Sequence, residues 1–132
     1  MCATVVITDT KLELIKIINY IVENPSYKEI HLYSNVNLAM NEIQKIKCQL
    51  IFVDADMNLL NAKEWIRLLV KKYPDINLVV VSANDSFALE ALKIGAIDFF
   101  MKPITQETIL IFEEKFEKRF SNEHILTENQ QY

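Results

Sequence analysis

The chain has 132 residues, the length of one ordinary domain, and its 51% hydrophobic and 24% charged residues are typical of a folded globular protein, not of a disordered one. The net charge is −4 and the Lys and Arg residues are spread along the chain, so it lacks the concentrated basic face of a nucleic-acid-binding domain. No apolar run is long enough to span a membrane, no leader peptide is evident, and Cys2 and Cys48 match no metal-binding spacing, so we expect a cytoplasmic protein with reduced thiols.

Short apolar, β-branched runs alternate with segments of helical periodicity along the chain. In chain order, strands are predicted at residues 5–7, 29–33, 50–53, 78–81 and 97–101. Helices are predicted after them, at residues 14–22, 35–46, about 62–73, 86–94 and 106–120. The first helix is expected to bury Leu14, Ile17, Ile18, Ile21 and Val22. The third and fourth strands are wholly apolar, as expected of central parallel strands that are buried on both faces.

Strict alternation of five strands and five helices predicts an α/β domain with a doubly wound parallel sheet and helices on both faces. Right-handed crossovers restrict the topology, and we expect the flavodoxin-like strand order 2-1-3-4-5. The domain is expected to cover residues 1–120, with residues 121–132 as a polar tail or the start of a linker to an output domain.

Polar residues follow four of the predicted strands, at the ends where functional sites form in such sheets. These segments are Thr8-Asp9-Thr10, Asp54-Ala55-Asp56, Ser82-Ala83 and Met101-Lys102-Pro103. The fold would bring their carboxylates, hydroxyl and ammonium groups together at one edge. Oxygen ligands of this kind suit Mg²⁺, and a carboxylate beside Mg²⁺ can attack a phosphoryl group. The pattern therefore predicts a phosphoryl-transfer site with a magnesium ion.

The residues at these strand ends resemble those of the response-regulator receiver domains of bacterial two-component systems. The resemblance covers about residues 4–120 and rests on Asp9, Asp54, Ser82-Ala83 and Lys102-Pro103. The stretch at residues 84–104, NDSFALEALKIGAIDFFMKPI, is most similar to receivers joined to LytTR-type DNA-binding domains. The resemblance implies a CheY-like fold and a signalling switch, not an enzyme.

In such a switch, Asp54 would accept a phosphoryl group from a sensor histidine kinase. The resemblance implies that Ser82 would donate a hydrogen bond to this group and that Lys102 would pair with its charge. Phe99 would be the aromatic switch residue that turns inward when Ser82 moves. The bond between Lys102 and Pro103 is expected to be cis.

The resemblance also implies a metal site in which Mg²⁺ is held by Asp9, Asp54 and the backbone carbonyl of Asp56. Receivers usually carry two adjacent acids after the first strand, whereas this chain has Asp9 followed by Thr10. Shifting the register so that Asp9 becomes the second acid would turn charged residues of the first helix toward the core. Thr10 is therefore expected to replace the usual acid as a weak ligand, because a hydroxyl binds Mg²⁺ less well than a carboxylate.

Two alternative functions stay open. Thr10, together with Asn58 where Pro is usual and Ala62 where Gly is usual, favours a degenerate pseudo-receiver that binds a protein partner without phosphate chemistry. A small flavodoxin-like enzyme or cofactor binder is disfavoured, because Gly95 is the only glycine and a glycine-rich phosphate loop is therefore excluded.

The expected response to phosphorylation is a shift in the surface formed by helix four, strand five and helix five. A phosphoryl group would add about −1.5 to −2 charges at Asp54. The altered surface would form a homodimer or, if the chain is a fragment, release a DNA-binding output domain to control transcription. Direct contact with nucleic acid or with a membrane is not expected from this domain.

Overall fold

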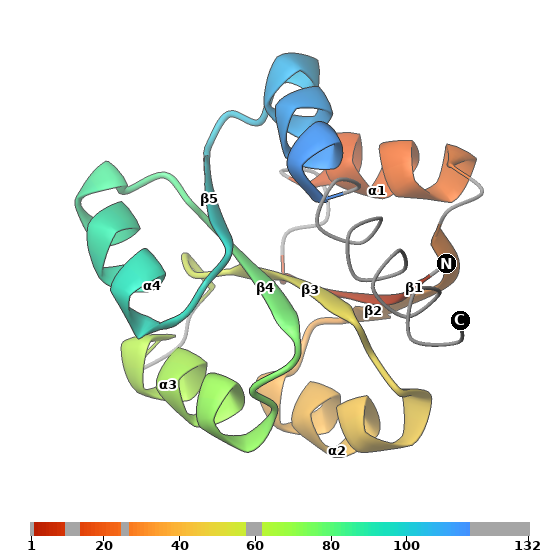
Figure 1. Ribbon diagram of the computed structural model, residues 1–132, viewed down its shortest axis with the longest axis vertical. Helices are drawn as coiled ribbons and strands as arrows, with labels where there is room; N and C mark the ends of the chain where they lie inside the picture. The colour runs from red at the N-terminus through yellow and green to blue at the C-terminus, as the bar shows by residue number, and fades with distance from the viewer. Residues whose placement is uncertain (1, 10–13, 25–26, 58–61, 117–132) are drawn as a thin grey trace, which may run out of the picture.

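The computed structural model describes residues 2–9, 14–24, 27–57 and 62–116 (Figure 1). It contains one parallel five-stranded sheet with the strand order β2-β1-β3-β4-β5, which confirms the predicted topology. The strands are β1 (Cys2–Ile7), β2 (Tyr27–Tyr33), β3 (Leu50–Asp54), β4 (Asn77–Ser82) and β5 (Asp98–Met101).

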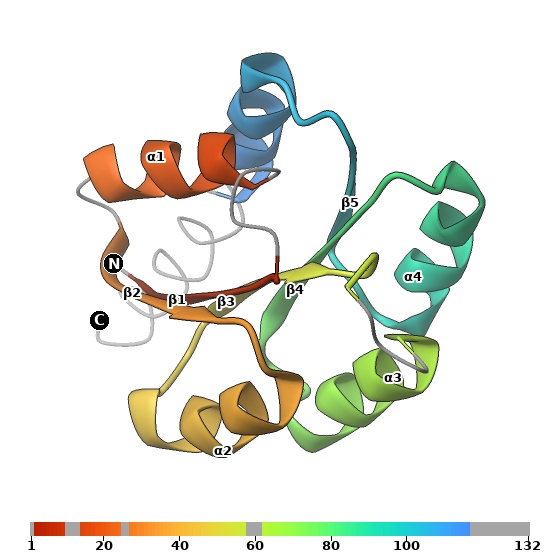
Figure 2. The same cartoon turned by 180° about the vertical axis from the view of Figure 1, so that it is seen from behind.

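Helices cover both faces of the sheet. The labelled helices are α1 (Ile15–Glu23), α2 (Val36–Ile46), α3 (Ala62–Lys72) and α4 (Ala88–Ile94), with the short 3₁₀ helix η1 (Asp85–Phe87) before α4. Residues 106–116 form a further helix, here named the C-terminal helix. Figures 1 and 2 show α1 and the C-terminal helix on one face of the sheet and α2, α3 and α4 on the other. Within the described residues, no helix is long and apolar enough to cross a membrane.

Each face of the sheet has its own apolar core. The core under α1 and the C-terminal helix is built around four phenylalanines. The ring of Phe112 lies 5.8 Å from that of Phe52, 5.4 Å from that of Phe100 and 5.5 Å from that of Phe116, measured between centroids. These contacts account for the apolar stripe of the C-terminal helix and dock this helix next to the end of β5.

Two details of the predicted helices are wrong. Val22 is 63% exposed and not part of the core, because it lies one residue past the buried Ile21 and its side chain turns away from the sheet. The helix predicted from residue 86 begins as the 3₁₀ turn of η1, where the side chain of Asn84 accepts a hydrogen bond from the backbone N–H of Ser86. Residues 117–120 of the predicted last helix, and the tail at 121–132, lie outside the described residues.

Backbone hydrogen bonds continue past the strands and align their carboxyl ends. The backbone N–H of Ala55 donates to the carbonyl of Val81 at 2.8 Å, and that of Lys102 donates to the carbonyl of Ser82 at 3.0 Å. The polar residues that follow β3, β4 and β5 are therefore held in a fixed register to one another. This edge of the sheet is the place where the sequence predicted a site.

Candidate functional site

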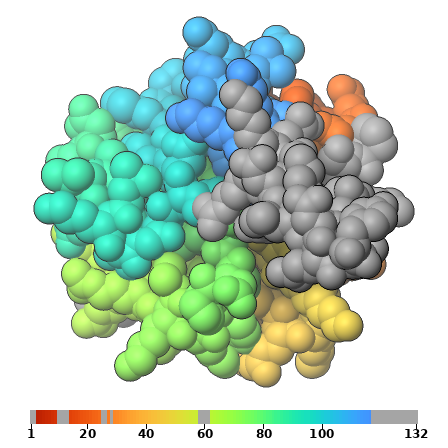
Figure 3. Space-filling view, in the orientation of Figure 1, coloured from red at the N-terminus to blue at the C-terminus, as the bar shows by residue number. Residues whose placement is uncertain are grey.

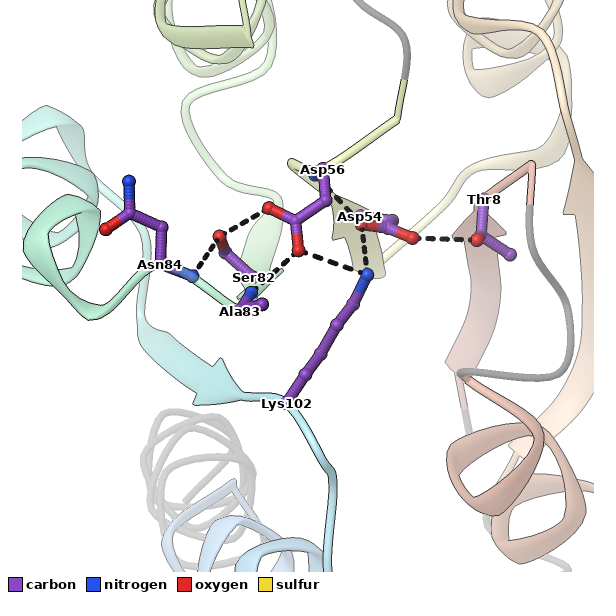
Figure 4. A network of polar contacts seen from close by, with 7 residues as sticks. All are labelled: Thr8, Asp54, Asp56, Ser82, Ala83, Asn84 and Lys102. Atoms are coloured by element: carbon purple, nitrogen blue, oxygen red, sulfur yellow. Dashed lines mark hydrogen bonds and ion pairs between the residues drawn. The ribbon is translucent and has the colours of Figure 1, made fainter.

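Asp54 is the buried carboxylate at the centre of this edge, with only 1% of its surface exposed. Its Oδ2 accepts a hydrogen bond from the hydroxyl of Thr8 at 2.9 Å. Its Oδ1 accepts two, from Lys102 Nζ at 2.9 Å and from the backbone N–H of Asp56 at 2.9 Å (Figure 4). A buried carboxylate is costly unless it is paired and hydrogen-bonded, and here one ammonium and two neutral donors meet that need.

Asp56 carries a second carboxylate, which points toward the end of β4. Its Oδ1 accepts a hydrogen bond from the hydroxyl of Ser82 at 2.6 Å. Its Oδ2 accepts one from the backbone N–H of Ala83 at 2.7 Å and lies 3.2 Å from Lys102 Nζ (Figure 4). Lys102, whose side chain is 9% exposed, therefore bridges the two carboxylates of the site.

The surroundings of Asp56 lower the pKa of its carboxyl group below the ordinary value. Partial burial is the largest single influence and raises the pKa. The hydrogen bonds from Ser82 and from the Ala83 backbone N–H, together with the hydrogen bond and charge of Lys102, outweigh it. Asp56 is consequently an anion at neutral pH, 3.2 Å from the ammonium of Lys102.

The structure brings together most of the residues predicted for the site. Asp54, Asp56, Ser82 and Lys102 come from three different strand ends and form one connected network of contacts. Asp9 follows Thr8 at the end of β1, and its side chain is exposed. The contacts of Asp56 described above are made by its side chain and its backbone N–H, and the predicted role of its backbone carbonyl as a metal ligand stays a prediction.

The remaining sequence predictions have different outcomes. The bond between Lys102 and Pro103 is cis, as predicted. Phe99 is partly buried and packs against the core under α2, α3 and α4, and its switch role stays a prediction. Thr10 and Asn58 lie outside the described residues, whereas Ala62 is the first residue of α3.

Sequence reasoning missed two donors, the hydroxyl of Thr8 and the backbone N–H of Ala83. The signal for Thr8 was its position in the strand pattern. Ile7 of β1 pairs with Val53 of β3, so the next residues of the two strands, Thr8 and Asp54, lie side by side. The N–H of Ala83 had no signal in the sequence, because any residue except proline supplies the same donor.

The donor set suits magnesium, although it offers few carboxylates. The exposed Asp9, the buried Asp54 and the carbonyl of Asp56 supply oxygens, which Mg²⁺ prefers, and Mg²⁺ usually keeps several of its waters. Within the described part of the chain, no group of three or more His, Cys, Asp or Glu side chains is arranged to hold a metal ion. Oxygen donors that suit Mg²⁺ are therefore present at this edge of the sheet, and a magnesium site formed by them stays a prediction.

Comparisons with known proteins identify the family to which this fold and this strand-end network belong. Residues 5–112 match the response regulator receiver domain family, so the chain belongs to this family of two-component signalling proteins. The response regulator domain of Thermotoga maritima CheB has a similar structure, with a TM-score of 0.64 and 25% identity, covering 89% of this chain and 93% of that one.

Curated relatives match over part of their length. The sensory transduction protein LytT of Bacillus anthracis is 30% identical over 81 residues, which is 61% of this chain and 33% of LytT. Response regulator GtcR of Aneurinibacillus migulanus is 30% identical over 105 residues, 78% of this chain and 43% of GtcR. The chain thus spans less than half the length of either protein. The likeness to LytT is consistent with the resemblance to receivers of LytTR-type regulators.

Proposed function

We propose that the chain is a phosphoacceptor switch of a two-component system, with Asp54 as the residue that a sensor histidine kinase phosphorylates. The observation that supports this most is the surroundings of Asp54. It is a buried carboxylate at the carboxyl edge of the sheet, it accepts a hydrogen bond from Lys102, and the Ser82 hydroxyl belongs to the same network through Asp56. Membership of the receiver family points the same way. Such domains receive phosphoryl groups from histidine kinases and act on attached output domains.

In the proposed reaction, one carboxylate oxygen of Asp54 attacks the phosphorus of a phosphohistidine. The new O–P bond forms as the N–P bond breaks, and the imidazole leaves with the electron pair and then takes up a proton. Lys102 offsets negative charge on the transferring oxygens, and Ser82 donates a hydrogen bond to them. Magnesium, held by Asp9, Asp54 and the carbonyl of Asp56, would supply further neutralisation of charge.

The surface that would respond is formed by α4, β5 and the C-terminal helix. In Figure 3 these three elements adjoin along one side of the molecule. Large apolar side chains are exposed on each of them: Leu89 and Leu92 on α4, Met101 on β5, and Leu110 and Ile111 on the C-terminal helix. We propose that phosphorylation favours a homodimer through this surface, since pairing two copies would remove these side chains from water.

We also propose the extent of the receiver domain, its output and its location in the cell, from the resemblance to other receivers. Residues 1–120 would be the receiver, and residues 121–132 a tail or the start of a linker. In a longer form of the protein the output would be a LytTR-type DNA-binding domain that controls transcription. The receiver itself would act in the cytoplasm and would contact neither nucleic acid nor membrane.

A pseudo-receiver is the second candidate function. Thr10 favours it, because a neutral hydroxyl replaces the second acid. The absence of a three-ligand metal cluster among the described residues favours it as well. In this alternative, the surface of α4, β5 and the C-terminal helix binds a constitutive protein partner without phosphate chemistry.

Beryllofluoride, which stands in for a phosphoryl group, separates the two candidates. It is titrated in millimolar Mg²⁺ while Trp65 fluorescence and the size of the protein in solution are followed, with Asp54→Asn as the control. The proposal expects saturable binding and dimer formation that both require Asp54. If the wild-type chain and Asp54→Asn behave alike, the phosphoacceptor role is refuted and the pseudo-receiver is favoured.

A further inference from the structure

The carboxylate of Asp56 occupies donors that a phosphoryl group on Asp54 would need. Its two oxygens accept hydrogen bonds from the Ser82 hydroxyl at 2.6 Å and the Ala83 backbone N–H at 2.7 Å. Lys102 Nζ lies 3.2 Å from Oδ2 of the same carboxylate. A hydroxyl, a backbone N–H and an ammonium around one anion make up the kind of donor set that binds phosphoryl oxygens.

Competition is strict at two of these three donors. A hydroxyl and a backbone amide each have a single hydrogen to donate, so Ser82 and Ala83 serve either Asp56 or another anion. Lys102 has three hydrogens and already contacts Asp54 and Asp56 together. An anion entering the site therefore has to replace Asp56 at Ser82 and Ala83, while it can share Lys102.

We propose that Asp56 is an internal competitor of the phosphoryl group: in the unphosphorylated chain it holds the donors Ser82 and Ala83, and phosphorylation of Asp54 displaces it. This inference rests on the proposed function, because it assigns a regulatory role within the same site. Whether the phosphoryl group gains Ser82 and Ala83 as donors then depends on its exchange with the carboxylate of Asp56.

Exposure and charge make the exchange feasible. The side chain of Asp56 is 32% exposed, so it can turn into water without crossing the core, whereas that of Asp54 is 1% exposed and is fixed in place. A phosphoryl group would add about −1.5 to −2 charges next to the Asp56 carboxylate. Only one cation, Lys102, lies in the network that joins the described site residues, so repulsion would drive Asp56 outward.

The test compares beryllofluoride affinity in the wild-type chain and in Asp56→Asn. Asparagine keeps the size and shape of the side chain and removes its charge. Asp75→Asn is the matched control, because Asp75 is exposed in the connection from α3 to β4, at the opposite edge of the sheet, and the change in net charge is the same. The Mg²⁺ affinity of each protein is measured first, and beryllofluoride is then titrated at saturating Mg²⁺.

We expect Asp56→Asn to bind beryllofluoride about tenfold more tightly than the wild type, the size of effect that one charged hydrogen-bonding competitor exerts. Asp75→Asn is expected to bind like the wild type. Equal or weaker binding by Asp56→Asn, with Asp54-dependent binding in the wild type, refutes the competition and leaves the proposed function standing. If neither protein shows Asp54-dependent binding, both proposals fail. If only Asp56→Asn shows it, Asp56 blocks the donors and is not displaced, so the proposed function and the displacement step are both refuted.

A second measurement tests the contact itself without metal or beryllofluoride. The amide proton of Ala83 donates to a carboxylate, so its NMR resonance is expected downfield in the metal-free wild type and upfield of that position in Asp56→Asn. An Ala83 resonance that Asp56→Asn leaves unchanged would mean that the carboxylate does not hold this donor in solution. That outcome would overturn the inference independently of any phosphoryl chemistry.

Discussion

Replacing Lys102 with methionine removes the one ammonium that joins the two carboxylates of the site. Lys102 Nζ lies 2.9 Å from Oδ1 of Asp54 and 3.2 Å from Oδ2 of Asp56. The side chain of Lys102 is 9% exposed, and methionine places a long apolar side chain at the same position. The substitution therefore tests the loss of charge more than the loss of packing. Asp54 would keep its hydrogen bonds from Thr8 and from the backbone N–H of Asp56.

The expected loss of stability can be worked from these distances. At an effective dielectric constant of about 20, the attraction between Lys102 and Asp54 is roughly 6 kcal/mol before the cost of removing both groups from water. Breaking a buried pair by removing one partner costs about 3–5 kcal/mol. Asp56 adds less, because its side chain is 32% exposed and solvent screens its charge. We therefore expect Lys102→Met to lower the free energy of unfolding by about 3 kcal/mol.

Urea unfolding at neutral pH, followed by circular dichroism, measures this loss, with a chelator present so that no cation replaces the missing ammonium. Lys45→Met is the control, because Lys45 is 73% exposed and its contact with Glu42 should contribute about 1 kcal/mol or less. In the Lys102→Met background, Asp54→Asn should restore part of the loss, since it removes the buried charge that was left unpaired. A loss no larger than that of Lys45→Met would refute the reasoning.

Two further substitutions test the metal site and the packing of α4. Thr10→Asp restores a second acid after β1 and should tighten Mg²⁺ binding by about tenfold, or roughly 1.4 kcal/mol, as measured by titration of the metal-free protein. If Thr10→Asp binds Mg²⁺ no better than Thr10→Ser, residue 10 is not the missing ligand. Gly95→Ala should destabilise the fold by about 2 kcal/mol in urea, because Gly95 has a φ of +130° and an added Cβ would lie 2.9 Å from Cγ1 of Val70. In the Gly95→Ala background, Val70→Ala should remove the steric contact but not the strain of the positive φ, so the free energy of unfolding should recover only in part. Full recovery of the free energy of unfolding would show that backbone strain plays no part.

Periodicity in the sequence determined the sheet and most of the core. Alternating apolar runs and helical patterns predicted the five strands, since buried parallel strands must be apolar. The strand order, which the structure confirms, was predicted partly by analogy with flavodoxin-like sheets, within the limits that right-handed crossovers set. The same pattern placed Asp54, Ser82 and Lys102 at one edge, because the carboxyl ends of parallel strands meet there. Val22 was placed wrongly, since the pattern defines a helical face less sharply at its margin than at its centre.

The partners of each side chain at that edge were decided only by the tertiary structure. The sequence placed Asp56 near the site, but the donors that its carboxylate meets depend on where the chain turns after β3. In the folded chain that turn directs the carboxylate to Ser82 and Ala83, which are 26 and 27 residues away in sequence. Thr8 likewise lies beside Asp54, 46 residues away, because two strands pair in one register. Local preferences act over a few residues, whereas contacts across such separations form only when the whole sheet is assembled.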